Sequence, residues 1–301
     1  MNILVIIMTN NNVLSDVHLE KVATNNSTIQ YTRFKFYSKL DPNIKNKAEE
    51  KPEKIESDDD DDDLKVTRDQ VNSEVIGIHH KMSTGLDKVG CQVWLGALLL
   101  CDYVTENSDV FSGQHVLELG SGTGLLAVVL SQFVESLCCT DYCDEILNLC
   151  RRNLKNNKSF DNTNKGVSVQ KLDWLADVDY EKINRNSKII VAADCFYDCQ
   201  LTKAFFKTLL KVVVYLLEGS SKRSLSCYFS IEKRLNFCAS ELKIVSKEYD
   251  DFTVRLHEFV DELRLKDINC SVLKIENSAF NQYFSYQKTK FLELWKVSIS
   301  N

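Results

Sequence analysis

Proline and glycine are both scarce in this sequence of 301 residues. The two prolines are Pro42 and Pro52, no proline follows them, and glycine occurs only ten times. This scarcity excludes collagen-like and proline-rich chains. Long apolar runs are also missing: the longest near the start, Ile3 to Met8, is far shorter than the roughly 20 residues of a membrane helix. Because no basic segment and no small-residue cleavage site flank that run, we expect neither a signal peptide nor a membrane span.

Basic residues are not in excess. The chain has 37 Lys and Arg against 43 Asp and Glu, which gives a formal net charge of −6. One unbroken run of six aspartates, Asp58 to Asp63, accounts for that charge. Since the remainder is near neutral, we expect no direct contact with nucleic acid. Hydrophobic residues make up 44% and charged residues 27% of the chain, as in globular proteins.

Paired cysteine motifs are absent as well. The eleven cysteines all lie from Cys91 onward, and none forms a C-x-x-C pair. An odd count in a chain of this length does not fit a disulfide framework, and several cysteines lie inside apolar runs. We therefore expect free, buried thiols in a reducing compartment. No histidine lies at zinc-ligand spacing from these cysteines, so no metal site is predicted.

The sequence divides into three parts. Residues 1–40 contain two strand-like pieces, Val13 to Leu19 and Ile29 to Phe36. Residues 41–63 hold both prolines and the aspartate run, and with almost no large apolar side chain they predict a disordered acidic linker. The aspartate run is either a solvated spacer or a contact for a basic partner. Residues 64–301 have the composition of a globular domain.

Strand and helix patterns alternate through the globular part. Strands are predicted over Val116–Leu119, Leu137–Thr140, Val167–Leu172, Ile189–Ala193, Leu225–Ile231, Cys270–Ile275 and Phe291–Ser298. Helices are predicted over Trp94–Val104, Leu125–Val134, Asp144–Leu154 with Asp144 as N-cap, Leu201–Glu218 and 237–263. Repeated strand–helix units imply a parallel sheet covered by helices on both faces. The last two strands have no helix between them and predict an antiparallel hairpin at one edge. The fold class is therefore α/β, with seven mostly parallel strands.

Three of the ten glycines cluster between a predicted strand and a predicted helix. They are Gly120, Gly122 and Gly124, in the stretch E-L-G-S-G-T-G that begins at Glu118. Glycines at such a turn let the backbone approach a ligand closely. Asp141 ends the next strand, 21 residues after Gly120, where an acid can accept hydrogen bonds from ribose hydroxyls.

The spacing of this turn decides between two ligands. Dinucleotide-binding enzymes use G-x-G-x-x-G, whereas this turn reads G-x-G-x-G. A carboxylate at Glu118 would repel a pyrophosphate but suits the amino group of a methionine-like ligand. The turn resembles that of the seven-strand, class I methyltransferases, which implies a Rossmann-like methyltransferase sheet and S-adenosyl-L-methionine as cofactor. The alternatives are a nicotinamide enzyme and a glycine turn without ligand.

The same resemblance assigns further residues to the cofactor. Asp173 and Trp174 follow the third strand, and the resemblance implies that they flank the adenine; taken alone, Trp174 would be an ordinary partly buried side chain. Ala193 ends the fourth strand, at the position that faces the methyl group in this class. The predicted cofactor-binding residues are Trp94, Glu118, Gly120, Ser121, Gly122, Gly124, Asp141, Asp173, Trp174 and Ala193.

Asp194 and Tyr197, directly after that strand, are the predicted catalytic residues. Methyltransferases that act on adenine or glutamine amides carry a Pro-Pro pair here, and this chain has no proline beyond Pro52. Asp194-x-x-Tyr197 instead resembles the D-x-x-Y signature of the non-SET protein-lysine methyltransferases called family 16, whose tryptophan before the first helix matches Trp94. Tyr197 could equally be a packing residue, and Asp198 is expected to be solvated.

Several further stretches narrow the resemblance to one branch of this family: Val13–Leu19, Val89–Tyr103, Glu232–Phe237 and Leu292–Lys296. The resemblance implies a protein substrate with a target lysine, in particular a nucleic-acid-binding protein, and relatives that contact chaperones. It also implies a location in the nucleus, or in nucleus and cytoplasm. Two alternatives stay open: a small-molecule or RNA methyltransferase on the same fold, and a non-catalytic binding module that retains the cofactor site.

Overall fold

The computed structural model describes residues 8–9, 12–15, 17, 29–37, 73–157, 166–218, 223–238 and 243–301. The linker predicted over 41–63, with its aspartate run, lies outside these ranges. Within them, no helix combines the length and the apolar character needed to cross a bilayer. The ten cysteines whose side chains are described are free thiols, as predicted.

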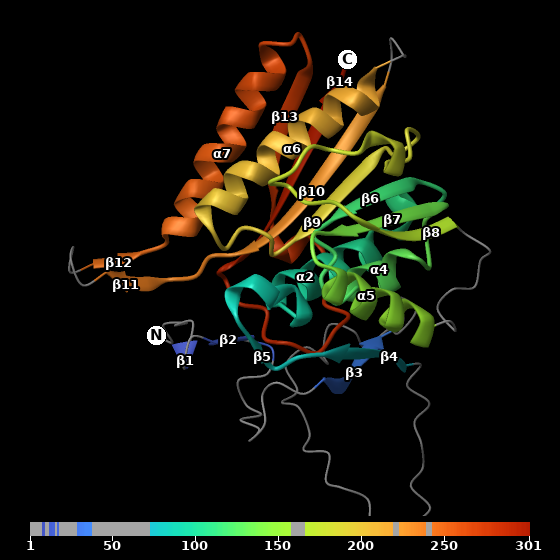
Figure 1. Ribbon diagram of the computed structural model, residues 1–301, viewed down its shortest axis with the longest axis vertical. Coiled ribbons are helices and arrows are strands. Elements are labelled where there is room, and N and C mark those ends of the chain that lie inside the picture. The colour runs from blue at the N-terminus through green and yellow to red at the C-terminus, as the bar shows by residue number, and fades with distance from the viewer. Residues whose placement is uncertain are drawn as a thin grey trace, which may run out of the picture.

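A seven-stranded sheet forms the centre of the molecule (Figure 1). Its strand order is β13-β14-β10-β9-β6-β7-β8, and β14 is antiparallel to both of its neighbours. The strands are β6 (His115–Leu119), β7 (Ser136–Asp141), β8 (Gly166–Lys171), β9 (Ile189–Ala193), β10 (Ser224–Glu232), β13 (Asn269–Ile275) and β14 (Leu292–Ser300). The predicted α/β fold with an antiparallel C-terminal hairpin is confirmed.

Helices cover both faces of this sheet (Figure 1). One face carries α2 (Leu95–Glu106), the short α3 (Ser108–Phe111), α4 (Leu125–Leu130) and α5 (Asp144–Asn156), and the other carries α6 (Cys199–Leu217) and α7 (Lys247–Arg264). Because side chains alternate along a strand, neighbours such as Val116 and Leu117 enter separate cores. Burial on both faces explains why the central strands are apolar throughout.

The strands near the N-terminus lie against this domain, below α2, α4 and α5 in Figure 1. They pair antiparallel as β1 (Met8–Thr9) with β2 (Asn12–Leu14), β2 with β5 (Ser83–Thr84), and β3 (Gln30–Tyr37) with β4 (Ser73–His80). Phe34 and Phe36 are buried in the same core as α2 and α4. The Gln92 side chain donates to the carbonyl oxygen of Val13 at 3.0 Å, and Ser15 Oγ donates to the carbonyl oxygen of Val93. These contacts fasten the N-terminal strands to the segment that precedes α2.

The helix predicted over 237–263 is wrong in its first ten residues. There the chain forms a two-stranded hairpin, β11 (Asn236–Cys238) with β12 (Lys243–Val245), and α7 begins only at Lys247. Ser246 occupies the N-cap position of α7, and its hydroxyl donates to the carbonyl oxygen of Arg234 at 2.8 Å. This bond holds the start of the helix against the end of β10, so the apolar residues before it pair as strands.

One predicted helix cap is wrong. The N-cap of α5 is Cys143 and not Asp144. Asp144 and Glu145 occupy the first turn instead, where carboxylates interact favourably with the helix dipole, and Glu145 pairs with Lys81 at 2.6 Å. Asp198 is exposed as expected, but it has a definite role as the N-cap of α6, accepting from the backbone N–H of Gln200 and Leu201. Among the described residues, short 3₁₀ helices include η2 (Leu86–Cys91), η4 (Tyr180–Lys182) and η5 (Asn277–Ala279).

Candidate functional site

A cavity of about 360 Å³ opens at the carboxyl ends of β6, β7 and β9. This is the edge of a parallel sheet where ligands usually bind. The cavity walls contain eleven of the twelve predicted site residues: Trp94, Glu118, Gly120, Ser121, Gly122, Asp141, Asp173, Trp174, Ala193, Asp194 and Tyr197. The twelfth, Gly124, is the N-cap of α4 and does not line the cavity. The structure therefore brings together residues that are spread over a hundred positions of sequence.

The turn after β6 is built from glycines in the left-handed region. Gly120, Gly122 and Gly124 have φ of 74°, 51° and 80°, values that side chains with a Cβ rarely adopt. A Cβ on Gly120 would also stand 2.6 Å from Cys195 Sγ and 3.3 Å from Trp174 Cζ2. Both the backbone conformation and the surrounding space thus require glycine here. Cys195, which the sequence did not single out, packs directly against the turn.

Asp141 joins the end of β7 to this turn. Its Oδ2 accepts the backbone N–H of Gly122 at 3.0 Å, and its Oδ1 accepts that of Tyr142 at 2.8 Å. Burial raises the pKa of Asp141 to about 6, although these backbone donors act in the opposite direction. The backbone N–H groups do not use all four lone pairs of the carboxylate, so the wall of the cavity can still offer an acceptor to a ligand hydroxyl.

Glu118 is the next-to-last residue of β6, just before the glycine turn. It is 1% exposed and lines the cavity. Burial raises its pKa to about 8. Its Oε2 accepts no hydrogen bond from any described residue, and the buried Ser121 Oγ beside the turn has no described partner either. A buried polar atom without a partner is costly, and a ligand that donates hydrogen bonds would remove that cost. An ammonium group would in addition favour the ionised form of Glu118.

These observations fit S-adenosyl-L-methionine. The unfilled acceptors of Glu118 and Ser121 suit its amino group, and Asp141 suits hydroxyls. Glycines with no room for a Cβ suit close approach of the ligand to the backbone. Of the possible ligands, a dinucleotide fits less well because its pyrophosphate would meet the carboxyl of Glu118.

Asp173 and Trp174 form the wall after β8. Asp173 Oδ1 accepts the backbone N–H of Leu175 at 2.9 Å, which closes a local turn. The Trp174 ring meets Phe205 edge to face, with 5.1 Å between ring centroids. Trp174 therefore has the position expected of a packing residue, against α6, and it also lines the cavity, as a cofactor contact would.

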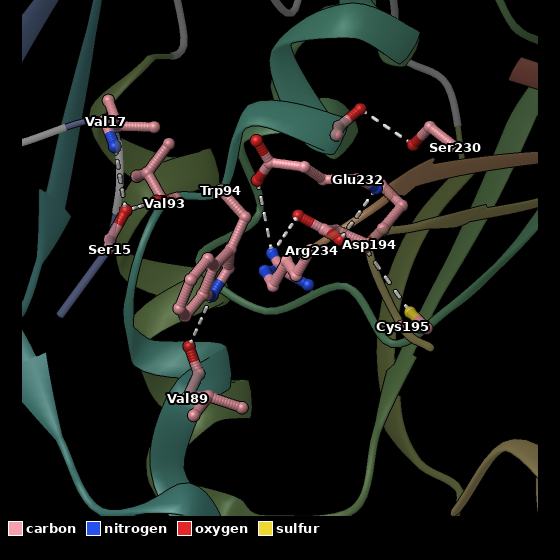
Figure 2. A network of polar contacts seen from close by, with 12 residues as sticks. Ser15, Val17, Val89, Val93, Trp94, Asp194, Cys195, Ser230, Glu232 and Arg234 are labelled. Atoms are coloured by element: carbon pink, nitrogen blue, oxygen red, sulfur yellow. Dashed lines mark hydrogen bonds and ion pairs between the residues drawn. The ribbon is translucent and has the colours of Figure 1, made fainter. Parts of the chain in front are cut away.

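Asp194 follows Ala193 at the end of β9 and is buried (Figure 2). Its backbone N–H donates to the carbonyl oxygen of Ser230 at 2.9 Å. Its Oδ2 accepts a hydrogen bond from Arg234 Nη2 at 2.8 Å. The sequence did not reveal Arg234, because 40 residues separate it from Asp194 and no spacing rule relates the ends of two neighbouring strands. The one available signal was its place in the E-K-R stretch that begins with the last residue of β10.

Two aromatic residues complete the wall. The indole N–H of Trp94, the N-cap of α2, donates to the carbonyl oxygen of Val89 at 2.9 Å. The Arg234 guanidinium lies 5.1 Å from the centre of that indole (Figure 2). Tyr197 is half-buried, and burial together with the nearby Cys195 and Asp141 raises its pKa. Trp94 and Tyr197 thus give the cavity aromatic faces next to carboxylates.

Comparison with known proteins gives a consistent result. A family model described as lysine methyltransferase matches residues 70–248. Methyltransferase-like protein 22 of Mus musculus is 36% identical over 240 residues, which cover 75% of this chain and 59% of that protein. The Homo sapiens protein of the same name is 36% identical over 239 residues, covering 74% and 57%. Calmodulin-lysine N-methyltransferase of Arabidopsis thaliana is 28% identical over 186 residues, covering 58% of each chain.

The match to the first two relatives spans less than two thirds of their length. The resemblance that the glycine turn and the D-x-x-Y motif indicated is confirmed.

Proposed function

This chain belongs to the lysine methyltransferase family, and from that premise we propose that it is a protein-lysine N-methyltransferase. The reaction transfers a methyl group from S-adenosyl-L-methionine to the side-chain amine of a lysine in a protein substrate. The observation that carries the proposal is the buried Glu118 carboxyl with its unfilled Oε2 beside the glycine turn. It is an acceptor for an ammonium ligand, in a cavity whose other wall carries Asp194.

Each part of the cavity has a binding role in this proposal. Glu118 and Ser121 accept hydrogen bonds from the amino group of the cofactor, and Asp141 accepts them from its ribose hydroxyls. The glycine turn allows close backbone approach. Asp173 and Trp174 flank the adenine. When bound, the cofactor supplies an electrophilic methyl group on a positively charged sulfur.

The acceptor must be a neutral amine. A lysine side chain has a pKa of about 10.4, so deprotonation at pH 7 costs about 4.6 kcal/mol in water. Burial in the cavity and a neighbouring positive charge both disfavour the ammonium form and reduce that cost. A carboxylate is a weak base for this task, so we assign Asp194 the role of accepting an N–H from the amine and orienting its lone pair. The Tyr197 ring can face a cationic or methylated amine.

The partners and the location rest on the family resemblance. We propose that the substrate is a nucleic-acid-binding protein, that the enzyme acts in the nucleus or in nucleus and cytoplasm, and that chaperones are among its contacts. Names of relatives such as calmodulin-lysine N-methyltransferase support a protein substrate.

The test is methyl transfer in a complete protein mixture. The full chain is incubated with radiolabelled S-adenosyl-L-methionine and an extract of cells that lack this enzyme, and the products are treated with protease or with ribonuclease. We expect a protease-sensitive label that mass spectrometry places on lysine, and no label with Asp194→Ala. A ribonuclease-sensitive label, a labelled small molecule or a methyl group on another residue type would overturn the proposal.

A further inference from the structure

Arg234 lies behind Asp194 as seen from the cavity. Asp194 lines the cavity, whereas Arg234 and Glu232 do not. Arg234 Nη2 is 2.8 Å from Asp194 Oδ2 and 3.6 Å from Glu232 Oε2, so the guanidinium stands between the two carboxylates (Figure 2). The Arg234 side chain is 7% exposed. Because a guanidinium stays charged at any working pH, these contacts hold a buried cation against the back of the cavity wall.

This contact distinguishes the two oxygens of Asp194. Oδ2 is occupied by the charge-assisted bond from Arg234, the stronger kind of hydrogen bond. Oδ1 accepts the backbone N–H of Glu232 at 3.4 Å, which is long for an N–H···O bond. Of the two oxygens, Oδ1 therefore has the weaker contact and the greater capacity to accept a further donor, and the bond at Oδ2 fixes its direction.

The backbone conformation and the packing around Asp194 constrain the direction of its side chain. Asp194 has a φ of 54°, a left-handed conformation that is uncommon for a residue with a side chain. A Cβ on Gly96, in the first turn of α2, would stand 2.8 Å from Asp194 Cβ. Ser230 Oγ donates to the carbonyl oxygen of Gly96 at 2.7 Å and so joins α2 to β10 (Figure 2). The Cα–Cβ bond of Asp194 is thus fixed by packing, and the remaining freedom is the rotation of its carboxylate.

We propose that Arg234 is a positioning residue for methyl transfer, which sets the rotation of the Asp194 carboxylate so that Oδ1 faces the incoming amine. The indole of Trp94 lies against the other side of the guanidinium, so the same residue ties the carboxylate to a predicted cofactor contact. This inference rests on the proposed function, since it assumes that an amine approaches Asp194.

The test compares two ligands that differ at the position of the methyl group. S-adenosylhomocysteine lacks the methyl group, and sinefungin carries an amine in its place. The dissociation constants of both are measured by calorimetry for the wild type, Arg234→Met, Arg234→Lys and Asp194→Asn. Arg264→Met is the matched control, because Arg264 is exposed and pairs with Asp261 on the surface of α7. Thermal unfolding of each variant reports on folding.

We expect Arg234→Met to lower the preference for sinefungin over S-adenosylhomocysteine about tenfold, the effect of one misdirected charge-assisted contact. Asp194→Asn should lower it at least as much, Arg234→Lys should retain most of it, and Arg264→Met should leave it unchanged. A general loss of packing would weaken both ligands equally and leave the ratio unchanged. An unchanged or increased ratio in Arg234→Met overturns the inference. If Arg234→Met does not fold, a ratio in Arg234→Lys equal to that of Asp194→Asn overturns it instead, because a retained cation should hold Oδ2.

The two proposals fail in different ways. A wild type that binds neither ligand, or that labels no lysine in the extract, contradicts the proposed function. A wild type that binds both ligands and methylates lysine, with a ratio that Arg234→Met leaves unchanged, contradicts the role of Arg234 alone.

Discussion

Asp102 and Glu118 are two buried carboxyl groups with contrasting surroundings. Asp102 on α2 and Glu118 on β6 both have a pKa raised by burial, to about 7 and to about 8. Asp102 Oδ1 accepts the backbone N–H of Tyr283 at 2.8 Å and of Phe284 at 3.0 Å, and Oδ2 accepts the hydroxyl of Tyr286 at 2.7 Å. Glu118 Oε2 accepts nothing from the described residues. Burial and a shifted pKa are thus common to both, and the unfilled acceptor in the cavity wall distinguishes Glu118 from Asp102.

Asp102, whose two oxygens both accept hydrogen bonds, has a structural role. Asp102 fastens the segment between β13 and β14 onto α2. Phe36 of β3 packs on that segment, with ring centroids 5.2 Å from Phe284 and 6.2 Å from Tyr283. One buried carboxyl therefore connects the C-terminal part, the first helix of the domain and an N-terminal strand, whereas the other faces a cavity.

The largest effect expected is on the chemistry of the cavity. Asp194→Ala should lower the rate of methyl transfer by roughly 100-fold or more, because the amine loses the group that orients it. Affinity for S-adenosylhomocysteine should stay nearly the same. Both quantities are measured on one preparation, by label transfer and by calorimetry. An unaltered transfer rate would remove Asp194 from the reaction.

The next effect should fall on stability alone. Asp102→Ala leaves two backbone N–H groups and the Tyr286 hydroxyl without their acceptor, which costs about 3 kcal/mol of unfolding free energy. Asp102→Asn, which keeps one carbonyl oxygen, should cost less. Denaturant unfolding measures the loss, and S-adenosylhomocysteine should bind the folded fraction normally. A stable Asp102→Ala variant that no longer binds this ligand would break the comparison.

Glu118→Gln should lower ligand affinity and leave stability intact, the opposite of what Asp102→Ala should do. The amide keeps the shape but removes the charge that holds an ammonium, so affinity for S-adenosylhomocysteine should fall about tenfold or more. Stability of the ligand-free protein should be kept or raised, because a buried ionisable group is replaced by a neutral one. Calorimetry and thermal unfolding measure the two effects, and full affinity in this variant would show that Glu118 is not the acceptor.

The smallest effect is a dependence on pH. A carboxyl whose pKa is raised on folding stabilises the protein at low pH, and this stabilisation is lost as pH rises through the folded pKa. Asp102 and Glu118 both act in this direction on the ligand-free protein. Only Glu118 must ionise to hold the ammonium, so affinity for S-adenosylhomocysteine should rise towards pH 8, by at most the factor that Glu118→Gln loses. Calorimetry from pH 6 to 8 tests this, and the slope should flatten in Glu118→Gln but persist in Asp102→Asn.

Local patterns were sufficient to predict most of the fold. The strand Ile189–Ala193 was predicted at its observed bounds, because a short apolar run between turns is readable from neighbouring residues. The glycine turn and Asp141 were predicted for the same reason. The hairpin at 236–245 was missed because its short apolar segments also fit a helix.

Long-range contacts between polar side chains could not be predicted from one sequence. Tyr286 and Asp102 are 184 residues apart, and Arg234, just after β10, reaches Asp194, just after β9. Such pairs depend on which strands become neighbours in the sheet, and no local spacing encodes them. The sequence therefore predicted Glu118, Asp141 and Asp194 as site residues, but it predicted neither Arg234 nor the contacts of Asp102.

The most direct test of the central claim, that this cavity binds S-adenosyl-L-methionine through its unfilled acceptors, is a calorimetric titration of the wild type at pH 8. We predict binding of one S-adenosylhomocysteine per chain, no binding of NAD, and no binding of either by Gly120→Arg, where a side chain would collide with Cys195. Binding of NAD without S-adenosylhomocysteine, or full affinity in Gly120→Arg, would contradict the account.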